Sequence, residues 1–430
     1  MPFWDTVMDS PSDIAYGNRL VPNVVDEIAL KDPARVCFSF PLSSPNPQGR
    51  YHDVTFRTFA NAVNKTAHFI RREIGCSAMF ETVMYMGHQD IRHFIILVAL
   101  MKTGHKVLFS SHRNSVAGHA ELIKQSDCGI LLYTSGFSVN LLLESCRMES
   151  VCIPELDYLL NDDALCDDFP YEKTFEEAKI HPCMVMHTSG TKGLPKPVVW
   201  THWTLAGADT EQLTPPFEGR PTLWGNLLTK TSKRSFSALP MFHGAGLISA
   251  VTRACFGHTA IVIGPPGITT ADTLARVLDH ADIDSAFCDP TPLEEAATRP
   301  DIMEKLGRLK YVAYTGGLLS QSAGDAISRV VPLYSVMTST ETAIFTQYAT
   351  DPEDWQYVFF DLTINGIEMR PHKGNLYELV IKRNAAQADH QAIFKNFPHL
   401  DEFSMPDLYE KHPSKPGLWK FVGRKDDISS

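Results

Sequence analysis

The sequence has little positive charge. Its 430 residues include 39 lysines and arginines against 50 aspartates and glutamates, which gives a formal net charge of -11. A nucleic-acid-binding surface needs clustered basic residues to neutralise phosphates, so this balance argues against a nucleic-acid partner. It remains compatible with a local basic pocket for a single nucleotide.

The chain also lacks segments that would export or anchor it. Its longest apolar run, residues 94–101, is far too short to cross a bilayer. The first ten residues carry acids and lack the basic-then-apolar order of a signal peptide. Its nine cysteines are dispersed without close pairs, which indicates reduced thiols and no disulfide framework. These absences predict a soluble, cytoplasmic protein without a membrane partner.

The sequence shows no internal repeat and no low-complexity tract. Its length exceeds what one hydrophobic core usually holds, so we expect two or three packed units. The first fifty residues look irregular, with a turn-rich loop at 43–49, and the acidic stretch 141–180 looks like a connection. Between them, helical and strand-like patterns alternate. The predicted helices are 56–70, 91–102 and 115–125, and the predicted strands are 82–86, 107–109 and 130–133.

A second alternating region runs from Met184 to about Thr315. It contains the predicted helices 271–281 and 291–298 and the predicted strands 285–288 and 310–314. After Val331 the pattern changes to the short strands 357–360, 367–370 and 376–381, with a hairpin turn at Lys373-Gly374. We therefore predict an α/β fold of two mainly parallel sheets with a smaller β-rich, barrel-like subdomain. The predicted boundaries are 1–180, 181–330, 331–423 and a hinge starting at 424–430.

The strongest chemical signal is the string HTSGTKGLPKPV at residues 187–198, directly after an apolar stretch. Its glycines and hydroxyl side chains would let backbone N–H groups turn inward around an anion, and Lys196 adds a charge for a phosphate oxygen. The spacing is not that of a Walker loop, and Pro195 and Pro197 oppose a helix here. A generic cluster of this composition would be an ordinary polar surface loop.

The full string, however, resembles the signature loop of the adenylate-forming superfamily, which includes acyl- and aryl-CoA ligases, luciferases and the adenylation domains of nonribosomal peptide synthetases. By this resemblance the loop binds the phosphates of ATP. The implied contacts are Thr188, Ser189, Gly190, Thr191, Lys192, Gly193 and Lys196. The superfamily usually has a second Thr or Ser where Lys192 stands. We therefore expect this loop, with one hydroxyl fewer and one more positive charge, to bind the phosphates differently.

Two further segments resemble superfamily motifs in the expected order. ALPMFHGAG, residues 238–246, resembles the segment beside the acyl pocket, which implies that Phe242, His243 and Gly244 line that pocket. A lone histidine can instead be an ordinary core residue. YTGGLLS, residues 314–320, resembles the glycine pair over which the nucleotide and acyl group lie, which implies roles for Gly316 and Gly317. A plain tight turn is the alternative.

A fourth segment, YSVMTSTETA at 334–343, resembles the motif that supplies adenine contacts, a phosphate-binding threonine and a magnesium ligand. The last two roles would fall to Thr340 and Glu341, and a carboxylate is a suitable ligand type for Mg²⁺. The superfamily's usual aromatic and glycine are replaced by Met337 and Thr338. Both would still line the nucleotide and acyl pockets, with altered nucleotide affinity and a narrower pocket floor.

The last segment, residues 406–427, resembles the ribose-binding and hinge region. Asp407 would accept hydrogen bonds from the ribose, Arg424 would approach the sugar or a phosphate, and Asp426 or Asp427 would be the hinge. Superfamily members continue into a small C-terminal subdomain with a catalytic lysine. Because the sequence stops at Ser430, we expect it to be a core without that subdomain.

The N-terminal sequence and the particular residues of the signature loop resemble those of fungal nonribosomal-peptide-synthetase-like proteins. The resemblance is greatest to carboxylic acid reductases built from adenylation, carrier and reductase domains. The resemblance implies ATP-dependent activation of a carboxylic acid to acyl-AMP, with Mg²⁺ at Glu341 and with Lys196 and His243 at the reacting groups. The acyl group would pass to the phosphopantetheine thiol of a carrier domain in the same polypeptide. NADPH would be needed only if a reductase domain follows.

The MFHG segment lacks the aspartate that holds an α-ammonium in amino-acid-activating relatives, and an unpaired buried ammonium is costly. We therefore predict a non-amino acid, preferably aryl, as the substrate.

Two other hypotheses remain. The chain could come from a stand-alone acyl- or aryl-CoA ligase, or it could be a catalytically silent nucleotide-binding module, for which Lys192, Met337 and Thr338 are the motivation.

Overall fold

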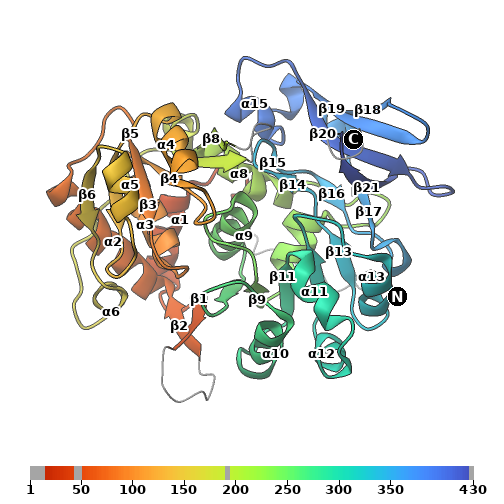
Figure 1. Cartoon of the computed structure of the whole chain (residues 1–430), viewed down its shortest axis with the longest axis horizontal. Helices are drawn as coiled ribbons and strands as arrows, with labels where there is room; N and C mark the ends of the chain where they lie inside the picture. Colours follow the sequence, from red (N-terminus) through yellow and green to blue (C-terminus); the bar gives the residue numbers. More distant parts are fainter. Residues whose placement is uncertain (1–14, 43–50, 189–193, 426–430) are drawn as a thin grey trace.

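Two layered sheets and a third, antiparallel sheet make up the architecture (Figure 1). The computed structural model describes residues 15–42, 51–188 and 194–425. Within the described residues, no helix combines the length and apolarity needed to span a membrane. The predicted fold class, two mainly parallel α/β sheets with a smaller β-rich unit, is confirmed.

The first sheet has six strands in the order β6-β5-β3-β4-β7-β8. All neighbours pair in parallel except β7 and β8, which form an antiparallel pair. The strands are β3 (Thr82–Met86), β4 (Lys106–Phe109), β5 (Cys128–Tyr133), β6 (Glu149–Cys152), β7 (Pro182–Thr188) and β8 (Lys196–Thr201).

The second sheet has seven strands in the order β13-β12-β11-β9-β10-β1-β2, and only the edge strand β2 runs antiparallel. The strands are β1 (Val36–Pro41), β2 (Tyr51–Thr55), β9 (Arg234–Ser237), β10 (Ala260–Ile263), β11 (Ser285–Cys288), β12 (Tyr311–Tyr314) and β13 (Leu333–Ser335).

Helices form three layers around these two sheets, one outside each sheet and one between them (Figure 1). The middle layer contains α1 (Val21–Lys31), α2 (Phe56–Glu73), α3 (Arg92–Lys102), α8 (His202–Thr210) and α9 (Gly244–Cys255). The outer layers contain α4 (Val116–Gln125) and α5 (Asn140–Ser145) on the first sheet, and α10 (Ala271–His280), α11 (Pro290–Ala296), α12 (Pro300–Leu306) and α13 (Gln321–Ser328) on the second. Four short helical segments connect them: α6 (Leu156–Leu159), α7 (Phe175–Ala178), η2 (Glu211–Leu213) and η3 (Leu223–Leu228).

Burial on both faces explains why the central strands read as unbroken apolar runs. In β3, Val83 and Tyr85 join the core between the two sheets, whereas Met84 and Met86 join the core under α4 and α5. In β11, Phe287 faces the middle layer, and its neighbours face α10 to α13. Successive side chains of a strand point to opposite faces, so both must be apolar when helices cover both.

The third sheet is antiparallel throughout, in the order β16-β17-β21-β20-β19-β18. The predicted hairpin at Lys373-Gly374 is confirmed, since it joins β18 to β19 with Gly374 at φ 62°. The strands are β16 (Gln347–Tyr348), β17 (Tyr357–Phe360), β18 (Ile367–Pro371), β19 (Leu376–Lys382), β20 (Glu402–Lys411) and β21 (Leu418–Arg424), and a separate two-stranded hairpin is formed by β14 (Thr338–Ser339) and β15 (Ala343–Ile344). Around them lie the short segments η4 (Pro352–Asp354), α14 (Leu362–Asn365), η5 (Ala385–Gln387) and α15 (Ala392–Asn396).

Two local predictions are wrong. The first fifty residues are not irregular throughout, because α1 and β1 form within them, and β1 pairs with β10 from the other half of the chain. The stretch 141–180 is not only a connection, because β6 adds an edge strand to the first sheet. Its residues are mostly exposed and carry no apolar run, so no local signal marks them as a strand. The predicted loop at 43–49 lies outside the described residues.

The sheets also divide the chain differently from the predicted boundaries. Strands β7 and β8 follow residue 180 yet complete the first sheet, while β1 and β2 belong to the second. Likewise β13 follows residue 330 and still joins the second sheet. Pairing between strands far apart in the sequence decides this membership, and boundaries drawn along the chain cannot express it.

An irregular segment, residues 158–169, lies along α2 and is held by that helix's polar face. Lys65 is buried and donates to three of its carbonyl oxygens, at 3.1 Å, 3.4 Å and 2.7 Å. Asn61 accepts from the Cys166 amide at 3.0 Å, and Asn64 donates to Asp168 at 3.2 Å. Side chains spaced three and four apart on a helix share one face, so α2 holds the segment along several turns.

Replacing Lys65 should therefore loosen this segment. We expect Lys65→Met to lower the free energy of unfolding by about 1–3 kcal/mol, because three carbonyl oxygens, one buried and two part-buried, lose their donor. Urea unfolding measures the loss. Lys124→Met, on the exposed face of α4, is the control and should change stability by less than about 0.5 kcal/mol. Equal effects of the two variants would contradict the role of Lys65.

Candidate functional site

The carboxyl ends of four parallel strands meet at one edge of the second sheet. Strands β9, β11, β12 and β13 run in the same direction, so the residues that follow them gather at that edge. Three of the predicted motif segments come directly after β9, β12 and β13. Open α/β sheets bind ligands at this edge, which makes it the candidate site.

The two ends of the signature string lie on β7 and β8, an antiparallel strand pair at the adjoining end of the first sheet. Strands β7 and β8 pair so that Thr188 lies opposite Lys196, and Lys196 is exposed. Because side chains alternate along a strand, Lys196, Val198 and Trp200 share one face of β8. Val198 and Trp200 are buried in the core between the sheets. The predicted phosphate contacts Ser189, Gly190, Thr191, Lys192 and Gly193 lie outside the described residues.

His187, the first residue of the string, ties β7 to the loop after β4. Its Nε2 accepts a hydrogen bond from the Ser111 amide at 3.0 Å. Burial, with smaller contributions from nearby His243 and His119, lowers the pKa of His187 to about 4. The imidazole is therefore neutral at physiological pH, as an accepting nitrogen requires. The link to His243 also places this strand pair close to the predicted acyl-pocket segment.

That acyl-pocket segment runs from the end of β9 into α9. His243 is the N-cap of α9, where its Nδ1 accepts from the Ala245 amide at 3.4 Å. The residue is exposed at one side, and partial desolvation of its imidazole lowers its pKa. Phe242 is buried, with its ring 4.8 Å from that of His112. Both rings line a cavity of about 150 Å³. Gly246 must stay a glycine, because a Cβ there would lie 2.2 Å from the Pro240 carbonyl oxygen.

The predicted phosphate and metal residues form the tip of a hairpin beside this segment. Thr340 and Glu341 make the turn between β14 and β15. A Cβ atom at Gly244 would lie 3.7 Å from the Thr340 hydroxyl, so the hairpin tip touches the start of α9. Next to the tip, the Thr338 hydroxyl lies 3.3 Å from that of Thr315.

The remaining predicted pocket residues lie on both sides of this hairpin. Gly316 and Gly317 follow β12 and are exposed. Gly316 has φ 88°, a left-handed conformation that favours glycine. The main chain of Met337 is fixed by the Gln347 side chain, which accepts from its N–H at 3.2 Å and donates to its carbonyl at 2.9 Å. The Met337 side chain packs against the core of the third sheet.

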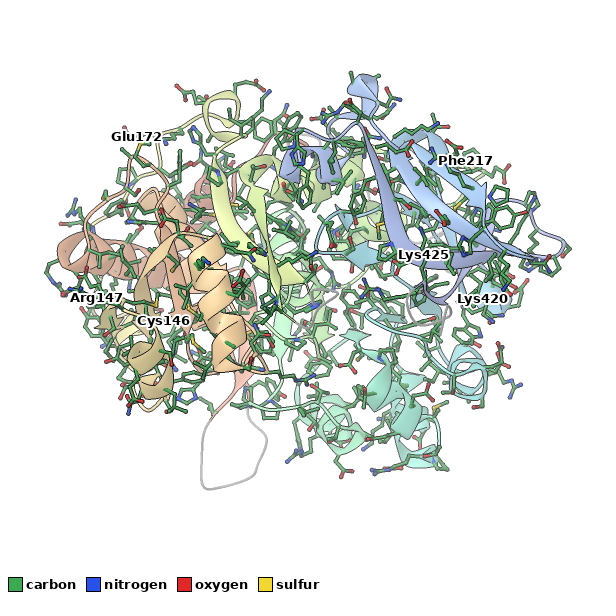
Figure 2. The ribbon with its side chains drawn as sticks, turned by 45° about the horizontal axis from the view of Figure 1, so that its top comes forward. Cys146, Arg147, Glu172, Phe217, Lys420 and Lys425 are labelled. Atoms are coloured by element: carbon green, nitrogen blue, oxygen red, sulfur yellow. The ribbon has the colours of Figure 1, made fainter. Side chains whose placement is uncertain are left out.

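Asp407, the predicted ribose ligand, is buried within reach of Glu341 and Arg424. It pairs across β20 and β21 with Arg424. Desolvation raises the pKa of Asp407 to about 6; the Arg424 charge opposes this rise, and the Glu341 charge adds to it. Just beyond, Lys425 pairs with Glu378 at 2.9 Å, beside the third sheet in Figure 2. The predicted hinge residues Asp426 and Asp427 lie outside the described residues.

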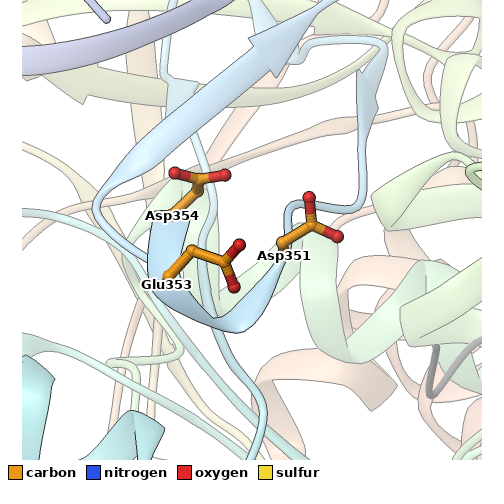
Figure 3. A group of neighbouring side chains, drawn as sticks. All are labelled: Asp351, Glu353 and Asp354. Atoms are coloured by element: carbon orange, nitrogen blue, oxygen red, sulfur yellow. The ribbon is translucent and has the colours of Figure 1, made fainter. Parts of the chain in front are cut away.

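A second carboxylate group, Asp351, Glu353 and Asp354, could geometrically share a metal ion (Figure 3). Its charge is already compensated by protein side chains. The Lys415 ammonium lies 2.5 Å from Asp354 and 3.2 Å from Glu353, and Arg220 pairs with Asp351 at 2.6 Å. The three carboxylates therefore form an ion-pair network that ties η4 to the loop between β20 and β21, and they add nothing to the candidate site.

Sequence reasoning assigned no role to several residues that hold the site together: His187, Trp200, Gln347 and Asn396. His187 and Trp200 could have been suspected, since they flank the signature loop on the two strands that carry it. Gln347 and Asn396 carry no local signal, because only the tertiary fold brings them to the residues they bind.

Comparison with known proteins agrees with this geometry. The carboxylic acid reductase of Neurospora crassa is 33% identical over 98% of this chain and 40% of its own length. The isocyanide synthase–NRPS hybrid crmA of Aspergillus fumigatus is 32% identical over 97% of this chain and 27% of its own length. The chain thus spans less than half the length of either relative. The N-terminal subdomain of Klebsiella oxytoca NpsA, solved with 3-hydroxybenzoyl-AMSN, superimposes with a TM-score of 0.68 at 15% identity, covering 94% of this chain and 100% of that one.

The fold is thus that of the N-terminal subdomain of an adenylation enzyme. The family described as AMP-binding enzyme matches residues 25–369. The chain belongs to this AMP-binding, adenylate-forming family, as the order of its motifs indicates.

The surroundings of Asp407 generate a pH prediction. Its pKa of about 6 in the folded protein exceeds the usual value near 3.8, so the folded state binds this proton more tightly than the unfolded state. The resulting contribution to the free energy of unfolding is full below about pH 4 and is lost as pH rises through about 6. In a ¹³C NMR titration we expect a carboxyl midpoint near 6 that Asp407→Asn removes. Glu341→Gln should lower the midpoint, because it removes a repelling charge. A midpoint near 4 in the native protein would contradict the assignment.

Proposed function

We propose that this chain activates a carboxylic acid with ATP. A carboxylate oxygen of the acid would attack the α-phosphorus of ATP, form the acyl-phosphate bond of acyl-AMP and break the bond to pyrophosphate. The supporting observation is the convergence of three motif segments where the ends of the two sheets adjoin: the Thr188/Lys196 pair of β7 and β8, the His243–Gly244 helix start and the Thr340–Glu341 turn.

The residues divide into charge-compensating and positioning roles. Lys196 and the amides of the signature loop would offset phosphate charge that otherwise repels the incoming carboxylate. Desolvation keeps His243 neutral at physiological pH, so its Nε2, which has no hydrogen-bond partner among the described residues, could donate to the acid. Thr340 would hydrogen-bond a phosphate oxygen, and ionised Asp407 would accept from the ribose hydroxyls.

Glu341 fits a Mg²⁺ ligand. Its carboxylate is half-buried, and within the described part of the chain no basic side chain forms an ion pair with it. It also lies near enough to Asp407 to raise that residue's pKa, which indicates uncompensated negative charge at this point. When bound, the ion would shield the phosphates of ATP, and Glu341 and Thr340 would hold it and its phosphate ligands in place.

The later steps are proposed from a relative, and the substrate class from the aromatic rings at the pocket. The N. crassa relative is named a carboxylic acid reductase, which supports acyl transfer to a carrier-domain phosphopantetheine and reductive release with NADPH. The A. fumigatus relative has a different name, so similarity alone does not choose the release step. For an aryl acid, the support is a pair of aromatic rings at the pocket, the buried Phe242 and the half-buried His112.

The function is tested by thermal melting of the protein with Mg²⁺, AMP and panels of aryl, aliphatic and amino acids. At a hundredfold excess over Kd, AMP with the matching acid should stabilise the fold by about 2.7 kcal/mol. Pyrophosphate exchange with the acids that bind then tests catalysis. Absence of any response to adenine nucleotides would contradict the proposed function, and nucleotide binding without pyrophosphate exchange would favour the silent nucleotide-binding module. A response to amino acids alone would exclude the aryl preference.

Variants at the phosphate site should act specifically. We expect Lys196→Met and Glu341→Gln each to weaken Mg²⁺·ATP binding at least about tenfold, because each loses a charged contact. Lys373→Met, in the exposed hairpin turn, and Glu353→Gln, in the compensated acidic group, are the matched controls. Calorimetric titration with Mg²⁺·ATP measures all four. Equal losses from Glu353→Gln and Glu341→Gln would contradict the metal assignment.

The pKa of Asp407 also predicts the pH dependence of nucleotide affinity. Only the carboxylate accepts two ribose hydrogen bonds, so AMP should bind more tightly as pH rises through about 6. Asp407→Asn should weaken binding above pH 6 and flatten the profile. A native profile without a change between pH 5 and pH 7 would remove Asp407 from the nucleotide site.

A further inference from the structure

We propose that Trp200 and Asn396 are positioning residues that hold the Thr340–Glu341 turn in register with the Lys196 strand. This inference rests on the proposed function, because it concerns how the chain keeps its phosphate and metal ligands in place. It assigns a role to two side chains outside all the signature motifs.

Two successive carbonyls of the turn are bound from different parts of the chain. The Trp200 Nε1–H donates to the Thr340 carbonyl oxygen at 2.8 Å, and Trp200 is only 1% exposed. The Asn396 amide donates to the Glu341 carbonyl oxygen at 2.9 Å. With both carbonyls bound, the backbone of the turn has little freedom to rotate, so the directions of the Thr340 and Glu341 side chains are fixed.

Both donors are themselves held. The Trp200 ring packs where α9 begins, since a Cβ at Gly244 would lie 3.6 Å from it. Asn396 is oriented by the Thr204 hydroxyl, which donates to its side-chain oxygen at 2.6 Å. Thr204 is also the partner of Thr201 in the capping box that starts α8, directly after β8. Buried, mutually oriented hydrogen bonds of this kind define one geometry and lose energy if any member moves.

The turn needs this support. The residue that follows the turn, Ala343 at the start of β15, has φ 56°, a conformation unfavourable for a residue with a Cβ. The hairpin that the turn closes has only two residue pairs, Thr338 with Ile344 and Ser339 with Ala343. Within the turn, Ser339 accepts from the Thr342 amide at 3.1 Å. A hairpin this short is marginal by itself, so bonds from β8 and α15 have a large share in its stability.

The connection to Lys196 follows from strand geometry. Trp200 and Lys196 lie on the same face of β8, four residues apart. The indole therefore joins the strand that carries the phosphate-binding lysine to the turn that carries the metal-binding glutamate. Movement of the turn relative to the strand would separate the two groups that must contact one triphosphate. Small displacements of positioned groups are costly in such sites.

The first test removes the indole donor while keeping an aromatic ring. We expect Trp200→Phe to weaken Mg²⁺·ATP binding about fivefold in calorimetric titration and to leave metal-free AMP binding within about twofold. Trp355→Phe is the matched control. Trp355 is also buried and loses an equivalent Nε1 bond, to Asp325 at 3.0 Å, but it packs in the core under α10 to α13 and not in the core that contains Trp200 and Ala343. The control should bind Mg²⁺·ATP as the native protein does.

A double-variant cycle separates positioning from general loosening. If Trp200 acts through Glu341, Trp200→Phe should have little further effect on Mg²⁺·ATP affinity in the Glu341→Gln background. Asn396→Ala should weaken Mg²⁺·ATP binding in the same way as Trp200→Phe. Fully additive losses, or equal weakening of Mg²⁺·ATP and metal-free AMP, would overturn the positioning role in favour of a purely structural one.

Hydrogen exchange gives a readout that needs no nucleotide. Amides 340–343 should exchange faster in Trp200→Phe and Asn396→Ala than in the native protein and in Trp355→Phe. Unchanged exchange would overturn the inference whatever the binding data show. If the native protein binds no adenine nucleotide, the proposed function fails and the positioning role fails with it. If the native protein binds Mg²⁺·ATP and Trp200→Phe binds it equally well, only the positioning role fails.

Discussion

Two parallel sheets packed against one shared layer of helices constrain everything else in this molecule. The largest core cluster contains side chains from both sheets and from the helices between them. Its formation depends on pairings between segments far apart in the chain, such as β1 with β10 and β4 with β7. Once those strands are fixed, the loops that follow them can reach only a small region, and the candidate site lies there.

Hydrogen bonds from neighbouring elements then refine the position of each motif within that region. Signature residues at a sheet edge are placed by the fold to within a few ångströms, which is insufficient for binding a triphosphate. Trp200, Asn396 and Gln347 bind main-chain groups of the segment 337–341, and His187 binds the loop after β4. Such contacts to the backbone leave the motif side chains available for a ligand.

Desolvation sets the charges in the same region. Burial of His187 and partial desolvation of His243 lower their pKa values, while Asp407 holds its proton more tightly than an exposed aspartate. The acidic group at Asp351, Glu353 and Asp354 shows the opposite arrangement, with each negative charge paired to a lysine or arginine. The contrast distinguishes carboxylates that maintain the fold from Glu341, which retains free coordination capacity within the described structure.

The sequence by itself determined the fold class, most of the central helices and strands, and the order of the signature motifs, because these depend on local periodicity and on residue types at fixed spacing. It supported Lys196, Glu341 and Asp407 as candidates but could not show that they converge. It also missed α1, β1 and β6, since the first two gain their partners from distant segments and the last is a polar edge strand. Only the tertiary structure decided which strands share a sheet and which side chains hold the Thr340–Glu341 turn. The contacts to the turn join residues 140 and 55 positions apart, and no local pattern along the chain encodes such a contact.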